Sequence, residues 1–496
     1  MNCRSTRSVL ILAWLTGQFL LADSPLPAPA TAVPRTRSVS DTLAALPGTN
    51  TQAVTARKPA PATPVSTANL TLNWRTNADS VDARILRQPL SRVLPHIAKA
   101  TGWQVFVEPG ADTLVSSAFK NQPSRTALDR ILSDFNYAIL PATNGRPRLV
   151  VFRTAASSAT EEIDAADALR VDNELIVRLK EGSKRTPEEL AQLTGGELAG
   201  KIDPIHAARL RYADAAAAEA ARKKIAALDG VTVDDNHRLP SNDSVGILDG
   251  LAAAGGLSIR PAEVSAGRLV IGLVDSVVQP INPAYDAFLI GRESVVGSTS
   301  TSAELSHGTS MFANLIKAAE ATAGPSGTSP NFGVISVDVY GANESTTAFD
   351  VAMGIHRAIQ KGANVVNLSL SSEADSPFLH GLIQSYQGQG VLFLAAAGND
   401  PVYSPTYPAS YPEVLAVTAG NSGGQYAPYA NRGPFVDLML PGSGIVPYAG
   451  DQWMVTGTST ATAYASGIAG ALWNPSIGSP ANLDSVLRTQ FGLKKP

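Results

Sequence analysis

The sequence contains a single cysteine, Cys3, and few charged side chains. Cys3 precedes an apolar N-terminal run that is expected to be removed, so the exported protein would contain no disulfide. Charged residues make up 16% of the 496 residues, and the formal net charge is −3. That balance provides no electrostatic footprint for nucleic acid or for an anionic membrane surface. We therefore expect a protein stabilised by a packed core, with no nucleic-acid partner.

The N-terminus also lacks an apolar run long enough to cross a membrane comfortably. Residues 8–22 (SVLILAWLTGQFLLA) form a short apolar segment preceded by two arginines. This pattern predicts a signal peptide over residues 1–22, cleaved after Ala22, with a second cleavage option in residues 28–32. An uncleaved signal anchor is the alternative. We expect a secreted or periplasmic, envelope-associated protein with no membrane span after cleavage.

Two changes of composition follow the signal. Residues 23–70 are rich in Pro, Ala, Thr and Ser without a sustained period, which predicts a flexible linker. Residues 72–153 alternate between amphipathic helices, expected over 88–102 and 124–136, and short apolar strands. This order predicts a small α+β domain.

A second small α+β unit is expected over residues 170–240. Strands alternate there with a capped helix over 186–195 and a longer helix over 214–230. Two βαβ-like halves of this kind predict a split, ferredoxin-like arrangement. The Gly- and Ala-rich residues 241–262 predict an exposed linker to the last part of the chain.

Residues 263–496 carry the pattern of an α/β domain. Uninterrupted apolar runs, such as 268–275 and 391–399, alternate with helical segments such as 346–362. Buried strands that alternate with helices predict a parallel sheet with helices on both faces. The predicted fold class is therefore α/β, preceded by two small α+β domains. Polar residues that follow such strands are expected to meet at one edge of the sheet, where sites form.

Four residues with the right chemistry stand at the ends of such elements. Asp275 ends the strand IGLVD, His307 opens the helical run SHGTSMFANLIKAA, and Asn399 ends AAAGN. Ser459 stands two residues after Gly457 and opens the Ala-rich helix in VTGTSTATAYASG. A serine nucleophile needs a base, a carboxylate that orients the base, and donors for the oxyanion. The alternative for Ser459 is a helix cap without a catalytic role.

The chain order Asp, His, Ser with these flanking residues resembles the subtilisin-like serine proteases, or subtilases. The motifs AAAGN, YANRGPFVDLMLPG and GTSTATAYASG are similar to those of the family. The resemblance implies that Ser459 attacks the peptide carbonyl and that His307 is its general base. It implies that Asp275 orients the base and that Asn399 donates to the oxyanion.

The resemblance also implies where a polypeptide substrate would bind. The segments NLSLSS and AAAGN would contact it, through Ser369, Leu370, Ser371, Ala397 and Gly398. Their small and apolar residues favour large uncharged substrate side chains. Calcium is common in the family, but no acidic cluster of this sequence is specific enough to name ligands. We therefore predict no cofactor and name no metal-ligating residue; bound calcium, with unknown ligands, is the alternative.

The two upstream units also resemble known domains. Residues 170–240 resemble the N-terminal propeptides of subtilases, which implies synthesis as a zymogen; a permanently attached spacer is the alternative. Residues 72–153 resemble the short N-terminal domain shared by secretins and TonB-dependent receptors, through ATGWQVFV and SRTALDRILSDFNYAIL. That resemblance implies a partner protein in the cell envelope, and a generic α+β spacer is the alternative.

Together these patterns predict a secreted or periplasmic subtilisin-like serine endopeptidase made as a zymogen. One alternative is a catalytically weak or inactive subtilase fold that serves as an envelope binding or scaffold protein. Another is a secretion-system or envelope scaffold whose function resides in residues 72–153. Labelling by a reagent directed at active-site serines separates the enzyme from both alternatives.

Overall fold

The computed structural model describes residues 70–141, 146–240, 244–247, 257–263, 267–297, 303–324, 329–421 and 423–493. The predicted signal peptide, its two cleavage options, nearly all of the 23–70 linker and most of the 241–262 linker lie outside these residues. The described chain falls into two compact units, one ending at Ile163 and one beginning at Asp164.

The first unit contains two small sheets and two helices. An antiparallel sheet has the order β1-β2-β4, formed by Leu70–Arg75, Ser80–Pro89 and Leu114–Gln122. A second sheet has the order β5-β6-β3-β7, formed by Asn136–Leu140, Arg148–Phe152, Gln104–Val107 and Glu161–Ile163. The helices are α2 (Leu90–Thr101) and α3 (Ser124–Ile131). The unit is α+β, but α3 is shorter than the helix expected over 124–136, because Asn136 already belongs to β5.

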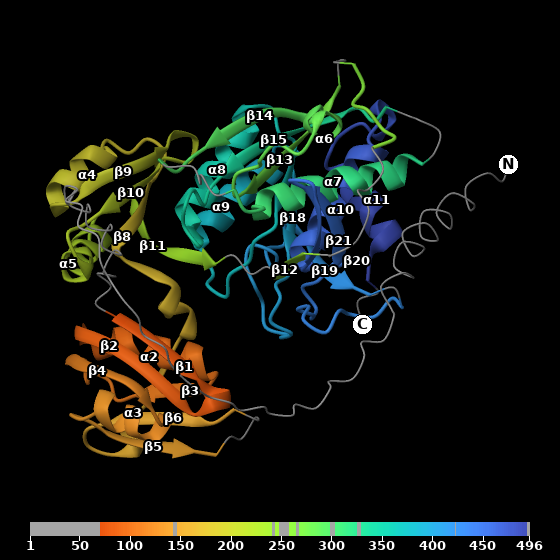
Figure 1. Ribbon diagram of the computed structural model, residues 1–496. Helices are drawn as coiled ribbons and strands as arrows, with labels where there is room; N and C mark the ends of the chain where they lie inside the picture. The colour runs from red at the N-terminus through yellow and green to blue at the C-terminus, as the bar shows by residue number, and fades with distance from the viewer. Residues whose placement is uncertain are drawn as a thin grey trace, which may run out of the picture. The chain divides into compact units, whose positions relative to one another are not determined.

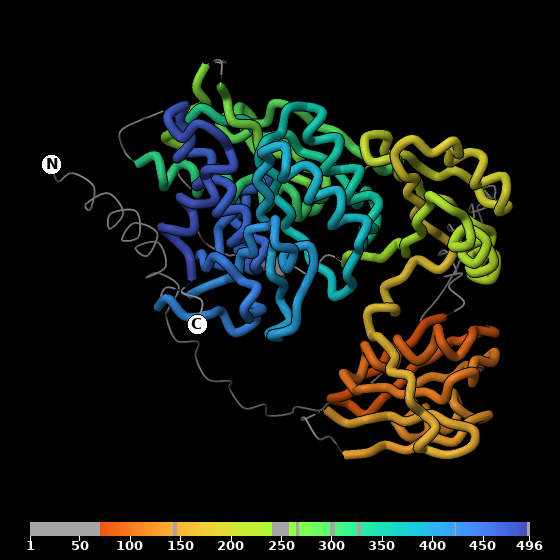
Figure 2. Tube along the Cα trace, turned by 180° about the vertical axis from the view of Figure 1, so that it is seen from behind, coloured from red at the N-terminus to blue at the C-terminus, as the bar shows by residue number. Residues whose placement is uncertain are grey.

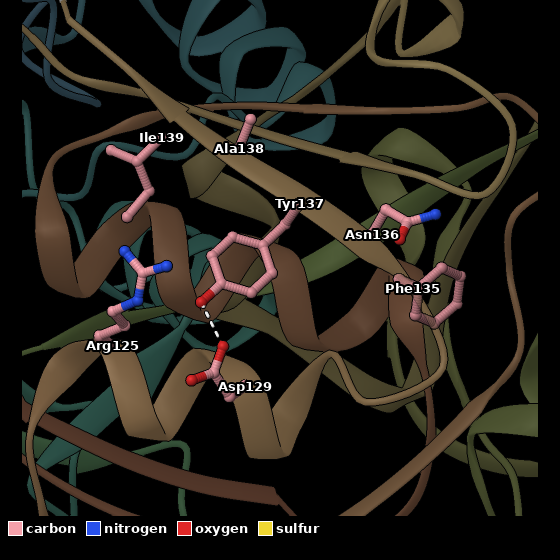
Figure 3. A pocket seen from close by; sticks show the side chains of 7 residues that line it. All are labelled: Arg125, Asp129, Phe135, Asn136, Tyr137, Ala138 and Ile139. Atoms are coloured by element: carbon pink, nitrogen blue, oxygen red, sulfur yellow. Dashed lines mark hydrogen bonds between the residues drawn. The ribbon is translucent and has the colours of Figure 1, made fainter.

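A hollow in this unit lies beside the edge strand β5 (Figure 3). It is lined by Arg125, Asp129, Phe135, Asn136, Tyr137, Ala138 and Ile139. The Tyr137 hydroxyl donates to Asp129 Oδ1 at 2.6 Å, which connects β5 to α3. Burial and this hydrogen bond raise the pKa of Tyr137 to about 12, so its hydroxyl keeps the proton it donates. None of the predicted catalytic residues lines the hollow.

The second unit begins with four strands of a five-stranded antiparallel sheet, in the order β11-β8-β10-β9; the fifth strand, β16 (Ser345–Thr347), lies beside β11. Its elements in chain order are β8 (Arg170–Leu179), α4 (Pro187–Thr194), β9 (Glu197–Ile202), β10 (Ala207–Arg211), α5 (Ala215–Ala226) and β11 (Val231–Pro240). Counted in chain order, the four strands of this part lie 4-1-3-2, with β8 and β10 in the centre, which is the ferredoxin-like topology. Local sequence sets the helix starts: Thr186 and Glu189 form a capping box on α4, and Asp214 caps α5.

A seven-stranded parallel sheet forms the centre of the second unit, in the order β14-β15-β13-β17-β18-β19-β20. Its strands are Leu289–Ser294, Phe332–Asp338, Leu269–Asp275, Val365–Leu368, Leu392–Ala396, Val414–Gly420 and Leu438–Pro441. Residues of β15, β17, β18 and β19 are buried along their whole length. The predicted α/β class is therefore confirmed, and the apolar runs of the sequence are strands covered on both sides.

Helices cover the two faces of this sheet (Figures 1 and 2). On one face, α7 (His307–Ala323) and α10 (Thr458–Leu472) pack against Leu269, Ile271 and Leu273 of β13. On the other face, α8 (Ala348–Gln360) and α9 (Pro377–Gln387) pack against Val274. Alternate residues of one strand thus enter two separate cores.

The small residues of α10 allow α7 to approach it closely. A Cβ added at Gly467 would lie 2.0 Å from the carbonyl oxygen of Leu315 on α7. Only glycine fits at that position without a shift of one helix. The close contact fixes the N-termini of both helices, and with them His307 and Ser459, relative to the sheet.

Shorter elements complete the second unit. They are β16 (Ser345–Thr347), β12 (Ser244–Ile247), β21 (Ser443–Tyr448), β22 (Asp451–Thr456), α6 (Pro283–Asp286) and α11 (Asn482–Phe491). The chain also forms 3₁₀ helices at Thr76–Ala78, Ala156–Ser158, Ala165–Leu169, Asp203–Ile205 and Pro475–Ile477. Among the helices of the described ranges, none combines the length and the apolar character that crossing a membrane requires.

Candidate active site

The site is built where neighbouring parallel strands end. Strands β13, β17 and β18 are consecutive in the sheet, and their carboxyl ends lie at the same edge. Asp275 is the last residue of β13, Ser369 follows β17, and Asn399 follows β18. Residues from three separate parts of the sequence are therefore brought together by the strand order.

His307 is the first residue of α7 and contacts Asp275 directly. Its Nδ1 atom lies 2.5 Å from Asp275 Oδ1. The Asp275 side chain is 1% exposed and that of His307 is 13% exposed, so water can reach only the imidazole. The contact holds the ring in one orientation, with Nδ1 on the carboxylate.

The first turn of α7 is fixed to the residues after β13. The backbone N–H of Gly308 donates to Ser276 Oγ at 2.9 Å. A Cβ added at Gly308 would lie 2.1 Å from the carbonyl oxygen of Ser276, so the close approach requires glycine. Ser306 caps the helix by accepting from the N–H of Thr309. The short motif Ser-His-Gly-Thr therefore places the imidazole over the end of β13.

Ser459 is the second residue of α10, and it is 6% exposed. Its hydroxyl donates to the carbonyl oxygen of Ser369 at 3.1 Å. In return, Ser369 Oγ donates to the carbonyl oxygen of Ser459 at 3.1 Å. This reciprocal pair connects the start of α10 to the end of β17. A hydroxyl has one proton, so in this conformation the proton of Ser459 points to Ser369.

A buried asparagine that the sequence analysis did not single out supports this connection. Asn367 on β17 donates from Nδ2 to Ser369 Oγ at 2.9 Å. Its Oδ1 accepts from Ser466 Oγ of α10 at 2.9 Å. The sequence signal was a polar residue inside the apolar run VVNLSL, since a fully buried amide needs partners.

Asn399 lies against the residue that precedes Ser459. Its Oδ1 accepts from the N–H of Thr458 at 2.8 Å and from Thr458 Oγ1 at 3.0 Å. A backbone N–H can only donate, so the Asn399 atom that contacts the N–H of Thr458 must be the amide oxygen, Oδ1. The amide nitrogen, Nδ2, therefore lies on the side of the amide group away from Thr458. The amide group is therefore held beside the N-terminus of α10.

The other residues predicted to bind substrate come directly after β17 and β18. Gly398 has φ +105°, and a Cβ there would lie 2.5 Å from Asn431 Nδ2 and 3.3 Å from Ser371 Oγ. Ala397 donates its N–H to Val417, and its carbonyl accepts from Thr406 Oγ1 at 2.6 Å. Leu370 is 4% exposed.

Burial shifts the two titrating groups of the site in opposite directions. Loss of water raises the pKa of Asp275 well above 3.8, and the nearby Asp338 carboxylate adds to the rise. Burial also lowers the pKa of His307 from 6.5, because the imidazolium loses water. The histidine is therefore held as the neutral imidazole, which is the form that can accept a proton.

The other histidines of the α/β domain lie in different settings. His356 of α8 contacts the hydroxyl of Tyr386 through Nδ1 at 2.7 Å, on the face opposite to α7. His380 of α9 contacts Glu413 at 2.9 Å and stacks on Tyr411.

Within the described ranges, no group of three or more His, Cys, Asp or Glu side chains could hold a metal ion.

The ferredoxin-like part contacts the α/β part next to this site. The end of β11 pairs antiparallel with β16, from Arg238 opposite Thr347 to Pro240 opposite Ser345. The following strand, β12, pairs antiparallel with β22, with Ser244 opposite Thr456. The strand before residues 241–243 thus pairs with the edge of β16, and the strand after them pairs with the edge of β22.

Comparison with known proteins agrees with these two parts. Residues 267–491 match the model of the subtilase family, and residues 157–233 match that of the fervidolysin N-terminal prodomain. Minor extracellular protease Epr of Bacillus subtilis (strain 168) is 32% identical over 204 residues, or 41% of this chain and 31% of that protein. Subtilisin Savinase of Lederbergia lenta is 34% identical over 181 residues, or 36% of this chain and 67% of that protein.

Another relative is covered over about half of its length. The M-protease of Shouchella clausii (strain KSM-K16) is 32% identical over 207 residues, or 41% of this chain and 54% of that protein. The chain thus spans between a third and about half of several relatives that it matches. The solved structure of the prenylagaramide maturation protease PagA has 26% identity and a TM-score of 0.37, covering 44% of this chain and 82% of that one.

Proposed function

The chain belongs to the subtilase family, and on this premise we propose that it is a serine endopeptidase that hydrolyses peptide bonds in polypeptides. The observation that carries the proposal is the 2.5 Å contact of His307 Nδ1 with the buried carboxylate of Asp275. A neutral imidazole held through Nδ1 presents Nε2 as its basic atom, which is what a general base for a serine hydroxyl requires.

In the proposed reaction the Ser459 hydroxyl turns from the Ser369 carbonyl toward Nε2 of His307. As Oγ attacks the substrate carbonyl, its proton passes to His307, and the Asp275 carboxylate stabilises the imidazolium that forms. The imidazolium then gives the proton to the leaving amine. A water molecule activated by the same imidazole hydrolyses the acyl-enzyme and restores Ser459.

The oxyanion of each tetrahedral intermediate needs donors that do not have to move. We assign this role to Asn399 Nδ2 and the backbone N–H of Ser459. The Asn399 amide is oriented by two hydrogen bonds from Thr458, and the N–H of Ser459 lies in the first turn of α10. The positive end of that helix favours the negative charge that develops there.

The substrate backbone would bind as an extended strand. The pairing of β11 with β16 supports this, because it demonstrates that the β16 edge accepts an antiparallel segment. Ser369, Leu370 and Ser371 after β17, with Ala397 and Gly398 after β18, would form the wall that receives the residue before the scissile bond. Their small size favours a large uncharged side chain.

We propose that the protein is made as a zymogen and that residues 170–240 are its propeptide. The match of residues 157–233 to a prodomain supports this, as does the position of β11 and β12 on either side of the site. We further propose secretion or export to the periplasm, directed by residues 1–22. The α+β unit at 72–153 would serve as a secretin/TonB-type domain that binds a partner protein in the envelope.

A phosphonate reagent that labels active-site serines tests the proposed activity. The processed wild-type protein should be labelled at a single residue, Ser459, and lose peptidase activity in step with labelling. The Ser459→Ala variant should remain unlabelled. A wild-type protein that folds but takes up no label at any pH would instead favour the inactive binding or scaffold protein.

A further inference from the structure

A second buried carboxylate lies next to the proposed triad. Asp338 is the last residue of β15, and it is 2% exposed. Strands β13 and β15 are parallel neighbours, and Asp338 is the register partner of Asp275. Partners on adjacent parallel strands point to the same face and are about 5 Å apart. Two carboxyl groups therefore lie side by side at the same edge of the sheet.

Both side chains lie on the face that α7 covers. The core under α7 and α10 contains every second residue of β13, namely Leu269, Ile271 and Leu273. Val274 belongs to the core on the opposite face, so Asp275, the next residue, points to the same face as Leu273. On β15, Val334 belongs to that same core, and Asp338 follows it at an even spacing. The Asp338 carboxyl is therefore on the side of the sheet where His307 contacts Asp275.

One oxygen of the Asp338 carboxylate accepts two backbone hydrogen bonds. Its Oδ1 accepts from the N–H of Tyr340 at 3.0 Å and from the N–H of Gly341 at 2.9 Å. Within the described residues, Asp338 Oδ2 and Asp275 Oδ2 accept no hydrogen bond although both are buried. Two N–H donors thus converge on Oδ1 of Asp338, whereas its Oδ2 is left without a donor from the described residues.

The packed elements place few other charges near this pair. Helix α7 contributes His307, whereas its charged residues Lys317 and Glu320 lie about three turns or more further along the helix. Helix α10 has no charged residue along its length. On β14, Arg292 and Ser294 share the face of Asp338, but both are exposed. The charged residues Asp350 and Arg357 belong to α8, on the opposite face, where His356 also lies. The buried phenol of Tyr340 has a raised pKa and stays neutral.

We propose that Asp338 is a positioning residue of the active site, whose charge sets the pH at which the Asp275–His307 pair becomes competent. The inference rests on the proposed peptidase function. The competent pair consists of an ionised Asp275 and a neutral His307. A negative charge on Asp338 repels the anion on Asp275, so it raises the pKa of that carboxyl. The same charge attracts the imidazolium, so it raises the pKa of His307 as well.

Both effects move the acid limb of the pH profile of kcat/KM in the same direction. Whichever group controls the acid limb of kcat/KM, removing the charge of Asp338 moves that limb to lower pH. Asp338→Asn removes the charge and keeps an oxygen that can accept from Tyr340 and Gly341. We expect its acid limb to lie about one pH unit below that of the wild type, with KM at the plateau unchanged.

The test measures two quantities against pH in the processed protein: kcat/KM for a peptide substrate, and the rate of Ser459 labelling by a serine-directed phosphonate. Both should shift together in Asp338→Asn, and Asp338→Glu, which keeps the charge, should retain the wild-type limb. Asp437→Asn is the matched control, since Asp437 is also buried and accepts from the N–H of Ala416. It should leave the limb in place.

Superimposable profiles of wild type and Asp338→Asn would overturn the inference, as would an equal shift in Asp338→Glu or Asp437→Asn. If Asp338→Asn does not fold, Asp338→Ser removes the same charge with a smaller acceptor, and the same downward shift is required of it. Labelling of Ser459 without a shift would refute the role of Asp338 alone. Absence of labelling in the wild type would refute the proposed function itself.

Discussion

Two serines of α10 allow the proposed catalytic role and the stability of the fold to be tested separately. Ser459 and Ser466 are two turns apart, and both hydroxyls donate a hydrogen bond to β17 or to the residue after it. Only Ser459 lies at the end of the helix next to Asn399 and the strand ends. The two residues therefore form a matched pair of substitutions.

We predict that Ser459→Ala lowers kcat by about 10⁶-fold, far more than the loss of its hydrogen bond to the Ser369 carbonyl lowers stability, which is about 1–3 kcal/mol. Ser466→Ala should affect stability alone. It leaves the buried Oδ1 of Asn367 without its donor, which costs about 1–3 kcal/mol of stability, and it retains kcat. Peptide turnover and urea unfolding of both variants check this. Comparable turnover by Ser459→Ala and wild type would remove Ser459 from the reaction.

Asn399 is predicted to act on the transition state alone. Asn399→Ala should lower kcat by about 10²–10³-fold and change KM little, because the oxyanion exists only during the reaction. Thr458→Val removes one of the two donors that orient the amide, so it should lower kcat less than Asn399→Ala does. Steady-state kinetics on one peptide decide the point. An effect on KM without one on kcat would assign Asn399 to substrate binding instead.

At the scale of elements, one arginine joins the ferredoxin-like part to the α/β part. Arg209 on β10 donates from Nη1 to both oxygens of Asp350 on α8, at 3.0 and 3.2 Å. Its guanidinium also lies 4.8 Å from the centre of the Phe349 ring. The side chains of Arg209 and Asp350 are 13% and 12% exposed, so this ion pair is largely removed from water.

Arg209→Ala should therefore release the propeptide sooner. Removing one partner of a buried pair leaves a charge without compensation, a cost of about 3 kcal/mol or roughly 10²-fold in affinity. We expect activity to appear earlier after processing, measured as the lag in peptide turnover. Lys201→Ala removes an exposed pair with Glu188 and should leave the lag unchanged. Equal lags in all three proteins would contradict a role for Arg209 in retention.

At the scale of the whole molecule, the chain pairs with strands of the α/β part both before and after residues 241–243. Residues up to Pro240 pair with β16, and residues from Ser244 pair with β22, whose last residue is Thr456. We predict that maturation separates residues up to about 240–262 from the α/β domain. The first cut is expected at one of the peptide bonds that join Pro240 to Ser244, made by Ser459 of the same chain.

Intact-mass analysis of exported wild type and Ser459→Ala tests the maturation. The wild type should appear as fragments cut in this interval, and the variant should retain the bond. Cleavage of Ser459→Ala at the same bond would assign maturation to another protease. A wild type that stays one chain and is fully active would make residues 170–240 an appended domain.

Local sequence patterns determined a large part of this protein. Strands buried on both faces must be apolar throughout, so the parallel sheet was readable from its runs of Val, Ile, Leu and Ala. Helix starts were marked by their caps, as at Thr186 and Asp214. Asp275, His307, Asn399 and Ser459 were identifiable because each ends or begins such an element, and their catalytic roles remain predictions.

The tertiary structure alone decided which residues meet. The register of β13 with β15 places Asp338 beside Asp275, and the order of the strands places Asn367 under α10. The pairing of β11 with β16 likewise joins segments distant in the chain. Neither strand order nor register follows from the period of a single strand, because both depend on packing between elements that are far apart in the sequence.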